Sequence, residues 1–88
     1  DLRNSDFRNS DLQGASFTES VLAGALFGEA RTFGADFRGA DLRGARELKP
    51  KQLSQMRTDD TTILPDGSRG PYLRYSGAER PAMTALGY

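Results

Sequence analysis

The chain of 88 residues contains no cysteine, no histidine and no tryptophan. Without cysteine and histidine it cannot form a disulfide framework, a zinc site of those ligands, a cysteine nucleophile or a histidine base. Twelve Lys and Arg balance twelve Asp and Glu, so the formal net charge is zero. This balance argues against a strongly basic nucleic-acid binder and equally against an acidic, DNA-like surface. No apolar run approaches the roughly 18 residues that a membrane span requires.

Proline is missing from the first 49 residues, and its distribution divides the chain in two. All four prolines follow that point, whereas six of the ten glycines precede it. The length allows one small domain. The two parts of that domain therefore differ in backbone chemistry.

The first part repeats every five residues. Small residues recur at this spacing, as Ser5, Ser10, Ala15, Ser20, Ala25, Ala30, Ala35, Ala40 and Ala45. A second series with the same spacing holds larger residues, as Leu2, Phe7, Leu12, Phe17, Leu22, Phe27, Thr32, Phe37 and Leu42. A period of five fits neither a helix nor a strand. We therefore expect each unit to turn a corner, with its small and its large residue both pointing inward.

Units such as 35–39 (ADFRG) and 40–44 (ADLRG) resemble the pentapeptide-repeat family, whose unit is A-[DN]-[LF]-x-x. The resemblance covers residues 1–48. It implies an all-β solenoid, a right-handed, four-sided parallel β-helix in which four units make one coil. The best-known members protect bacterial DNA gyrase by imitating duplex DNA, and many others have no known activity.

Four units per coil would stack residues that are twenty positions apart. This register predicts the columns Leu2–Leu22–Leu42, Phe7–Phe27, Leu12–Thr32 and Phe17–Phe37. Because each wall offers only two or three extended residues, we expect few formal strands. Since Asp1 begins in mid-unit, we also expect the chain to be the C-terminal part of a longer protein.

Residues 49–57 are predicted to form a capping helix. Glu47 stands where Leu or Phe belongs, and Pro50 suits the first helical position. Leu48 and Leu53 are spaced for a hydrophobic staple, and Leu53 with Met56 could cover the open end of the core.

Residues 58–88 are predicted to form a loop or turn and an extended tail. Leu64 to Gly67 (LPDG) fits a type I turn. The aperiodic residues 68–88 cannot build a core of their own, so we expect them to lie on the coils or on a neighbour. Asp59 and Asp60 are adjacent carboxylates, which we interpret as a turn feature rather than a metal or acid–base pair.

The candidate site is an apolar surface on the second coil. Val21 and Leu26 stand where the flanking coils carry Asp, and Ala23 and Gly28 stand where those coils carry Arg, with Leu48 one coil beyond Gly28. Phe33 also points outward. Such a patch is typical of a contact surface. Three alternatives remain open: the chain's own tail covers it, a separate protein or second copy binds it, or Phe33 turns inward in place of Thr32.

Two tyrosines of the tail, Tyr72 and Tyr75, are added to this candidate protein-interaction site because Tyr is favoured at interfaces. We expect a non-enzymatic scaffold that binds a protein partner, a larger complex or a second copy. The alternative is a DNA-mimic inhibitor or protector of a topoisomerase such as DNA gyrase, and an enzyme ranks third. We expect no catalytic residues, cofactor, metal, nucleic acid or small-molecule substrate.

Overall fold

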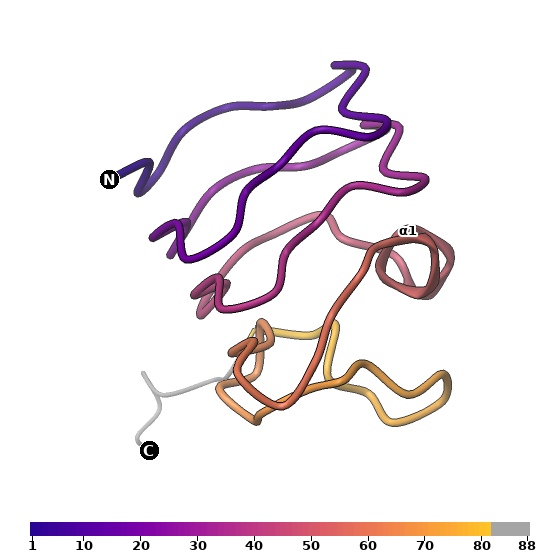
Figure 1. Cartoon of the computed structure of the whole chain (residues 1–88). Coiled ribbons are helices and arrows are strands. Elements are labelled where there is room, and N and C mark those ends of the chain that lie inside the picture. Colours follow the sequence, from indigo (N-terminus) through magenta and orange to yellow (C-terminus); the bar gives the residue numbers. More distant parts are fainter. Residues whose placement is uncertain (82–88) are drawn as a thin grey trace.

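The computed structural model describes residues 1–81, which wind into stacked coils followed by a short helix and an irregular segment (Figure 1). Parallel bridges join residues that are twenty positions apart, as Asp6–Leu26, Asp11–Arg31, Ser16–Asp36, Val21–Asp41 and Leu26–Arg46. Four five-residue units therefore complete one coil, and the predicted register is confirmed.

The bridges are isolated, with no continuous strand among the residues described. Each unit is short because it ends in a corner, where for example the Ala25 N–H donates to the Leu22 carbonyl at 3.0 Å. The last position of each unit adopts a left-handed backbone conformation, which glycine tolerates without strain. Gly39 has φ of 77° there, and a methyl group on it would lie 2.9 Å from Cγ of Glu19 in the coil before.

The core of the stack consists of the predicted inward residues. Phe27 and Phe37 are fully buried, and their ring centroids lie 6.0 Å apart in an edge-to-face arrangement. Phe7 stacks on Phe27 at 5.4 Å, and Phe17 stacks on Phe37 at 4.9 Å. Burial of each Leu or Phe contributes about 1.5–3 kcal/mol.

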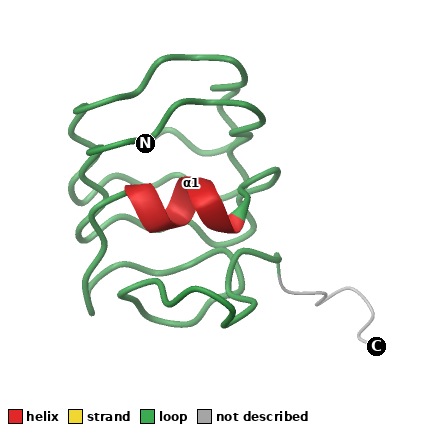
Figure 2. Ribbon diagram, turned by 90° about the vertical axis from the view of Figure 1, so that its right-hand side faces the viewer, coloured by secondary structure: helices red, strands yellow, loops and turns green. Residues whose placement is uncertain are grey.

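The single helix of the described chain, α1 (Pro50–Gln55), is shorter than the predicted 49–57. Pro50 occupies its first turn as expected, and the Lys49 N–H donates to Oε1 of Gln52 at 2.7 Å. Leu53 and Met56 are buried in the core, as predicted. Figure 2 shows α1 lying across one side of the coils.

Hydrogen bonds show that α1 replaces one wall of a further coil. The Thr32 hydroxyl donates to the Gln52 carbonyl at 2.9 Å, and the Gly34 N–H donates to the Gln55 carbonyl at 2.9 Å. Nε2 of Gln52 donates to the Phe27 carbonyl at 2.8 Å. The hydroxyl of Thr32, the one undersized residue of the inner series, therefore has its hydrogen-bond partner in the helix.

The coil path continues after α1. Arg57 pairs with Asp36 and Ile63 pairs with Asp41, both in parallel. The Leu42 N–H donates to the Ile63 carbonyl at 2.8 Å, just as the Leu22 N–H donates to the Asp41 carbonyl one coil earlier. The stacking of coils therefore continues past residue 48, the predicted end of the β-helix.

Leu48 is buried, although the candidate surface placed it near Gly28. The preceding residue, Glu47, adopts φ of 64° and is exposed. This corner turns the acid outward and lets Leu48 serve as the inward residue. Leu48 is therefore excluded from the candidate surface.

The segment after α1 extends the same hydrophobic core into the last coil. Thr62 is fully buried and its hydroxyl donates to the Phe37 carbonyl at 3.0 Å, and Leu64 is buried beside it. The Gly67 N–H donates to the Leu64 carbonyl at 2.8 Å, which confirms the predicted turn. The expectation that the tail lies on the coils holds for residues 68–81, and its remainder, 82–88, lies outside the described residues.

Candidate protein-interaction surface

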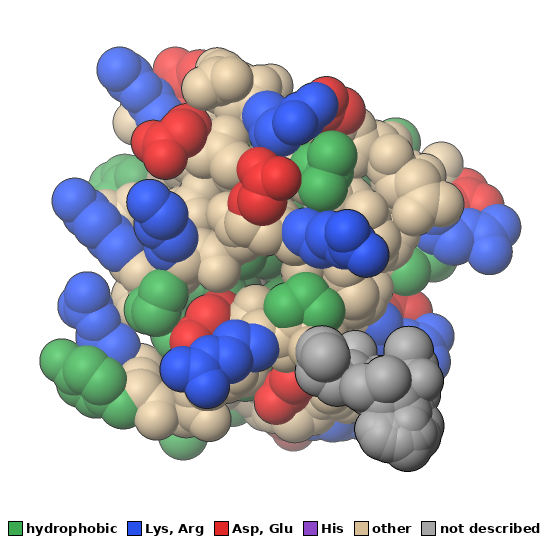
Figure 3. Space-filling view, turned by 180° about the vertical axis from the view of Figure 1, so that it is seen from behind, with side chains coloured by type: hydrophobic (Ala, Val, Ile, Leu, Met, Phe, Trp, Pro, Cys, Tyr) green, Lys and Arg blue, Asp and Glu red, His purple; other side chains and the backbone are tan. Residues whose placement is uncertain are grey.

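Four of the repeat units carry an ion pair within the unit on their outer surface. Arg3, Arg8, Arg38 and Arg43 each pair with the Asp two positions earlier, at 2.6–2.7 Å. Nε and Nη2 of Arg38 donate to the two carboxylate oxygens of Asp36, which lowers the pKa of Asp36 to about 2. Figure 3 shows blue and red side chains adjoining one another over one face. These walls carry charge that is already neutralised.

The adjacent carboxylates Asp59 and Asp60 belong to a local turn. Oδ1 of Asp59 accepts hydrogen bonds from the backbone N–H and the hydroxyl of Thr61, and these bonds lower the pKa of Asp59. Among residues 1–81, no cluster of three or more acidic side chains is placed to hold a metal ion. The same range contains no helix long and apolar enough to cross a membrane.

Val21 and Leu26 lie on two adjoining walls of the second coil. The side chain of Val21 is 38% exposed, and Leu26 is half-buried. The described tail packs against residues 58–66, for example through the bond from the Asp66 N–H to the Ala78 carbonyl at 3.2 Å. Val21 therefore remains accessible.

Phe33 is 65% exposed, whereas the neighbouring Thr32 is fully buried. The alternative in which Phe33 turns inward to replace Thr32 is therefore wrong. Because four units complete a coil, the units that contain Val21 and Phe33 form opposite walls. The predicted surface is accordingly not one patch, since Phe33 is separated from Val21 by a full wall.

The two tyrosines have different environments. Tyr72 is only 9% exposed, and its hydroxyl donates to Oε1 of Glu79 at 2.9 Å. Burial, followed by this carboxylate, raises the pKa of Tyr72 to about 12. Tyr72 therefore packs within the chain and offers no binding surface, which corrects its inclusion in the candidate site. Tyr75 is 93% exposed.

Two hollows meet at the start of α1. The first, here called the C-terminal hollow, has a volume of about 750 Å³ and contains Tyr75 in its lining. The second, the wall hollow, has a volume of about 460 Å³ and contains Phe33 in its lining. Lys49 and Lys51 line both hollows. The structure thus brings Phe33 and Tyr75, 42 positions apart, to the two sides of one lysine pair.

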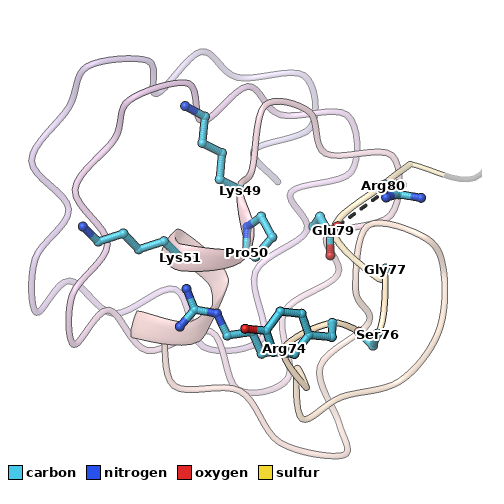
Figure 4. Close-up of a pocket in the computed structure, with 9 residues that line it drawn as sticks. Lys49, Pro50, Lys51, Arg74, Ser76, Gly77, Glu79 and Arg80 are labelled. Atoms are coloured by element: carbon cyan, nitrogen blue, oxygen red, sulfur yellow. Dashed lines mark ion pairs between the residues drawn. The ribbon is translucent and has the colours of Figure 1, made fainter.

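The lining of the two hollows is positively charged. Five cations and two carboxylates take part, namely Arg31, Lys49, Lys51, Arg74 and Arg80 with Glu29 and Glu79. In a chain of zero net charge, this excess concentrates positive potential on one side. Figure 4 shows the start of α1 and the 74–80 segment around the C-terminal hollow. This surface was not predicted from the sequence.

Comparison with known proteins agrees with the repeat pattern. Residues 1–31 match the family model for pentapeptide repeats, described as eight copies. The chain matches no protein in a search of curated proteins. The structure extends the five-residue pattern beyond the matched range, because the bridge from Leu26 to Arg46 keeps the same register. The predicted resemblance is therefore confirmed for residues 1–31, which match the pentapeptide-repeat family.

Proposed function

We propose that this protein is a non-enzymatic scaffold, a rigid right-handed β-helical rod that binds a protein partner. Binding takes place at the surface formed by Phe33, Lys49, Lys51 and Tyr75, here called the α1 face. The observation that carries the proposal is the pair of exposed aromatic rings beside two adjacent hollows. Exposure of apolar rings to water is unfavourable, and aromatic residues are enriched at protein–protein interfaces.

The neutral repeat walls favour a protein partner over DNA mimicry. A mimic of duplex DNA needs about one negative charge per 1.7 Å of rod. Here Asp1, Asp6, Asp36 and Asp41 are each compensated by an Arg of their own unit. The walls therefore lack the continuous negative potential that such a mimic presents.

Val21 and Leu26 form a second candidate contact surface, here called the coil-two surface. Val21 and Leu26 occupy the second position of their units, which holds Asp in the flanking coil above, at Asp1 and Asp6. Replacing these solvated acids by Val and Leu leaves apolar area on an outer wall, which favours association. This surface is proposed as an additional contact with the same partner or with a second copy.

Two double variants test these surfaces in parallel. Phe33→Ser with Tyr75→Ser alters the α1 face, and Val21→Asp with Leu26→Asp alters the coil-two surface. Ser16→Asp is the matched control because it adds an acid at the equivalent unit position of a polar wall. Pull-down followed by titration with the purified captured protein measures hetero-association. Light scattering after size exclusion measures self-association, and a melting curve accompanies each variant.

We expect the α1-face variant to weaken association by at least about tenfold, because two exposed aromatic anchors are removed. The control should bind like wild type, and all variants should melt near the wild-type temperature. Unchanged association in both double variants would contradict the proposed function. A loss of folding in the coil-two variant would show instead that Val21 and Leu26 are packed internally.

A further inference from the structure

The C-terminal hollow combines four cations with one carboxylate. Its charged lining residues are Lys49, Lys51, Arg74, Arg80 and Glu79. They come from two segments, the start of α1 and the loop of residues 74–80, which border the hollow (Figure 4). The positive charge of this site is therefore assembled by the fold and does not arise from a run of basic residues.

The carboxylates nearby leave much of this charge uncompensated. Glu79 is directed inward, since its side chain is 14% exposed and its Oε1 accepts the Tyr72 hydroxyl at 2.9 Å. Oε2 of Glu79 lies 3.8 Å from Nε of Arg80, and Oε2 of Glu29 lies 3.6 Å from Nζ of Lys49. Both distances exceed the 2.6–2.7 Å of the ion pairs within the repeats. Lys51 and Arg74 form no ion pair within the described part of the chain.

The shape of the hollow suits a peptide better than a single small anion. Its volume of about 750 Å³ exceeds what one phosphate or carboxylate would fill, and its cations are spread over both sides. Tyr75, with φ of 73°, presents an almost fully exposed ring in its lining. An aromatic ring provides apolar contact for the backbone and the methylene groups of a bound peptide.

A nucleic acid fits less well. Its backbone needs a continuous strip of free cations along the protein. Beyond the α1 face, the repeat walls place an acid beside each paired Arg, as at Asp36 and Asp41. Such neutralised walls offer no free cations to a polyanion that extends past the hollow. A short acidic peptide does not need them because it ends within the hollow.

We propose that the C-terminal hollow binds an acidic segment of the partner protein, whose carboxylates pair with Lys51 and Arg74 while Tyr75 packs against its backbone. This inference rests on the proposed function and specifies the chemistry of the partner. Lys49 and Arg80 add long-range attraction from the two ends of the site. The wall hollow and Phe33 accommodate the adjoining part of the same partner.

The test measures binding of a fluorescein-labelled hexaglutamate peptide to the full chain by fluorescence anisotropy at low ionic strength. Hexaglutamine of the same length is the uncharged reference. Lys51→Gln with Arg74→Gln removes two cations from the hollow. Arg57→Gln with Arg69→Gln is the matched control, because it removes two exposed arginines that lie outside the hollow.

We expect saturable binding of hexaglutamate, no binding of hexaglutamine, and affinity at least about fivefold weaker in the hollow variant. The control variant should stay within about twofold of wild type. Equal losses in both variants would overturn the proposal, because they would reveal general charge attraction. Tighter binding of a single-stranded oligonucleotide with six phosphates would also overturn it.

The two proposals fail in different ways. If hexaglutamate does not bind, but Phe33→Ser with Tyr75→Ser still weakens association with the partner, the acidic-segment inference is wrong and the scaffold function stands. If that aromatic variant leaves partner association unchanged, the α1 face itself is not the binding surface.

Discussion

The repeat segment and the segment after residue 49 contribute to one stack of coils by different means. In the repeats, each unit adds one small and one large inward residue, and the corners recur every five positions. After residue 49, α1 replaces one wall, and Arg57 and Ile63 take the positions of the next two walls. The coil geometry therefore continues beyond the sequence repeat that predicts it. Backbone hydrogen bonds to the coil above determine the path of the chain there.

The surfaces of the two segments differ in the same way. The repeat walls pair Asp with Arg inside single units, which leaves little free charge. The C-terminal segment instead gathers cations and exposed aromatic side chains around α1. The regular repeats thus form a nearly neutral support, and the irregular C-terminal segment forms the surface that we propose as the binding site. The predictions below test this division.

The largest expected effect lies in the repeat core. Phe27→Ala removes a fully buried ring that contacts Phe7 and Phe37, and it should lower the free energy of unfolding by about 3–5 kcal/mol. Urea denaturation followed by circular dichroism measures this change. Phe33→Ala is the matched control on the surface and should change stability by less than about 0.5 kcal/mol. Equal effects of the two substitutions would refute the inward and outward assignment.

The repeat period predicts the interior of the first 45 residues almost completely. Inward residues, register and corners all follow from one pattern, because each unit repeats the same local geometry. Thr32 interrupts that pattern, and its hydrogen-bond partner, the Gln52 carbonyl, could not be predicted since it belongs to the aperiodic segment. The burial of Thr62 was unpredictable for the same reason.

The candidate site was predicted only in part. The outward positions of Val21 and Phe33 follow from the repeat period, and the structure shows both exposed. The exposure of Tyr75 could not be predicted in this way, because it lies in the aperiodic segment. Tyr72 was assigned wrongly because its burial depends on Glu79, which reaches it only through the folding of the tail. The lysine pair of the α1 face was missed, since contact between residues around 50 and around 75 has no periodic indication.

A smaller effect on the free energy of unfolding is expected at low pH, and it arises from the Asp–Arg pairs of the repeat walls. The guanidinium groups of Arg8 and Arg38 lower the pKa of Asp6 and of Asp36 from an ordinary 3.8 to about 2. A carboxyl group whose pKa is lower in the folded state stabilises the fold above its unfolded pKa. This contribution is therefore present above about pH 4 and is lost as the pH falls towards 2. Exposure to solvent keeps it small.

Denaturation midpoints of wild type and Arg38→Gln between pH 6 and pH 2 measure this contribution. The variant lacks the charged partner of Asp36 but keeps the backbone N–H that also donates to it. The difference between the two proteins should shrink as the pH falls through the range of the lowered pKa. A difference that grows with acid would contradict the assigned role of the pair.

The most direct test of the continuous stack is native-state hydrogen exchange measured residue by residue. The Leu22 N–H donates to the Asp41 carbonyl within the repeats, and the Leu42 N–H donates to the Ile63 carbonyl across the two segments, both at 2.8 Å. If residues 57–65 continue the coils, the Leu42 amide exchanges as slowly as the Leu22 amide, through the same cooperative unfolding. Rapid exchange at Leu42 beside strong protection at Leu22 would show that the stack ends with the repeats.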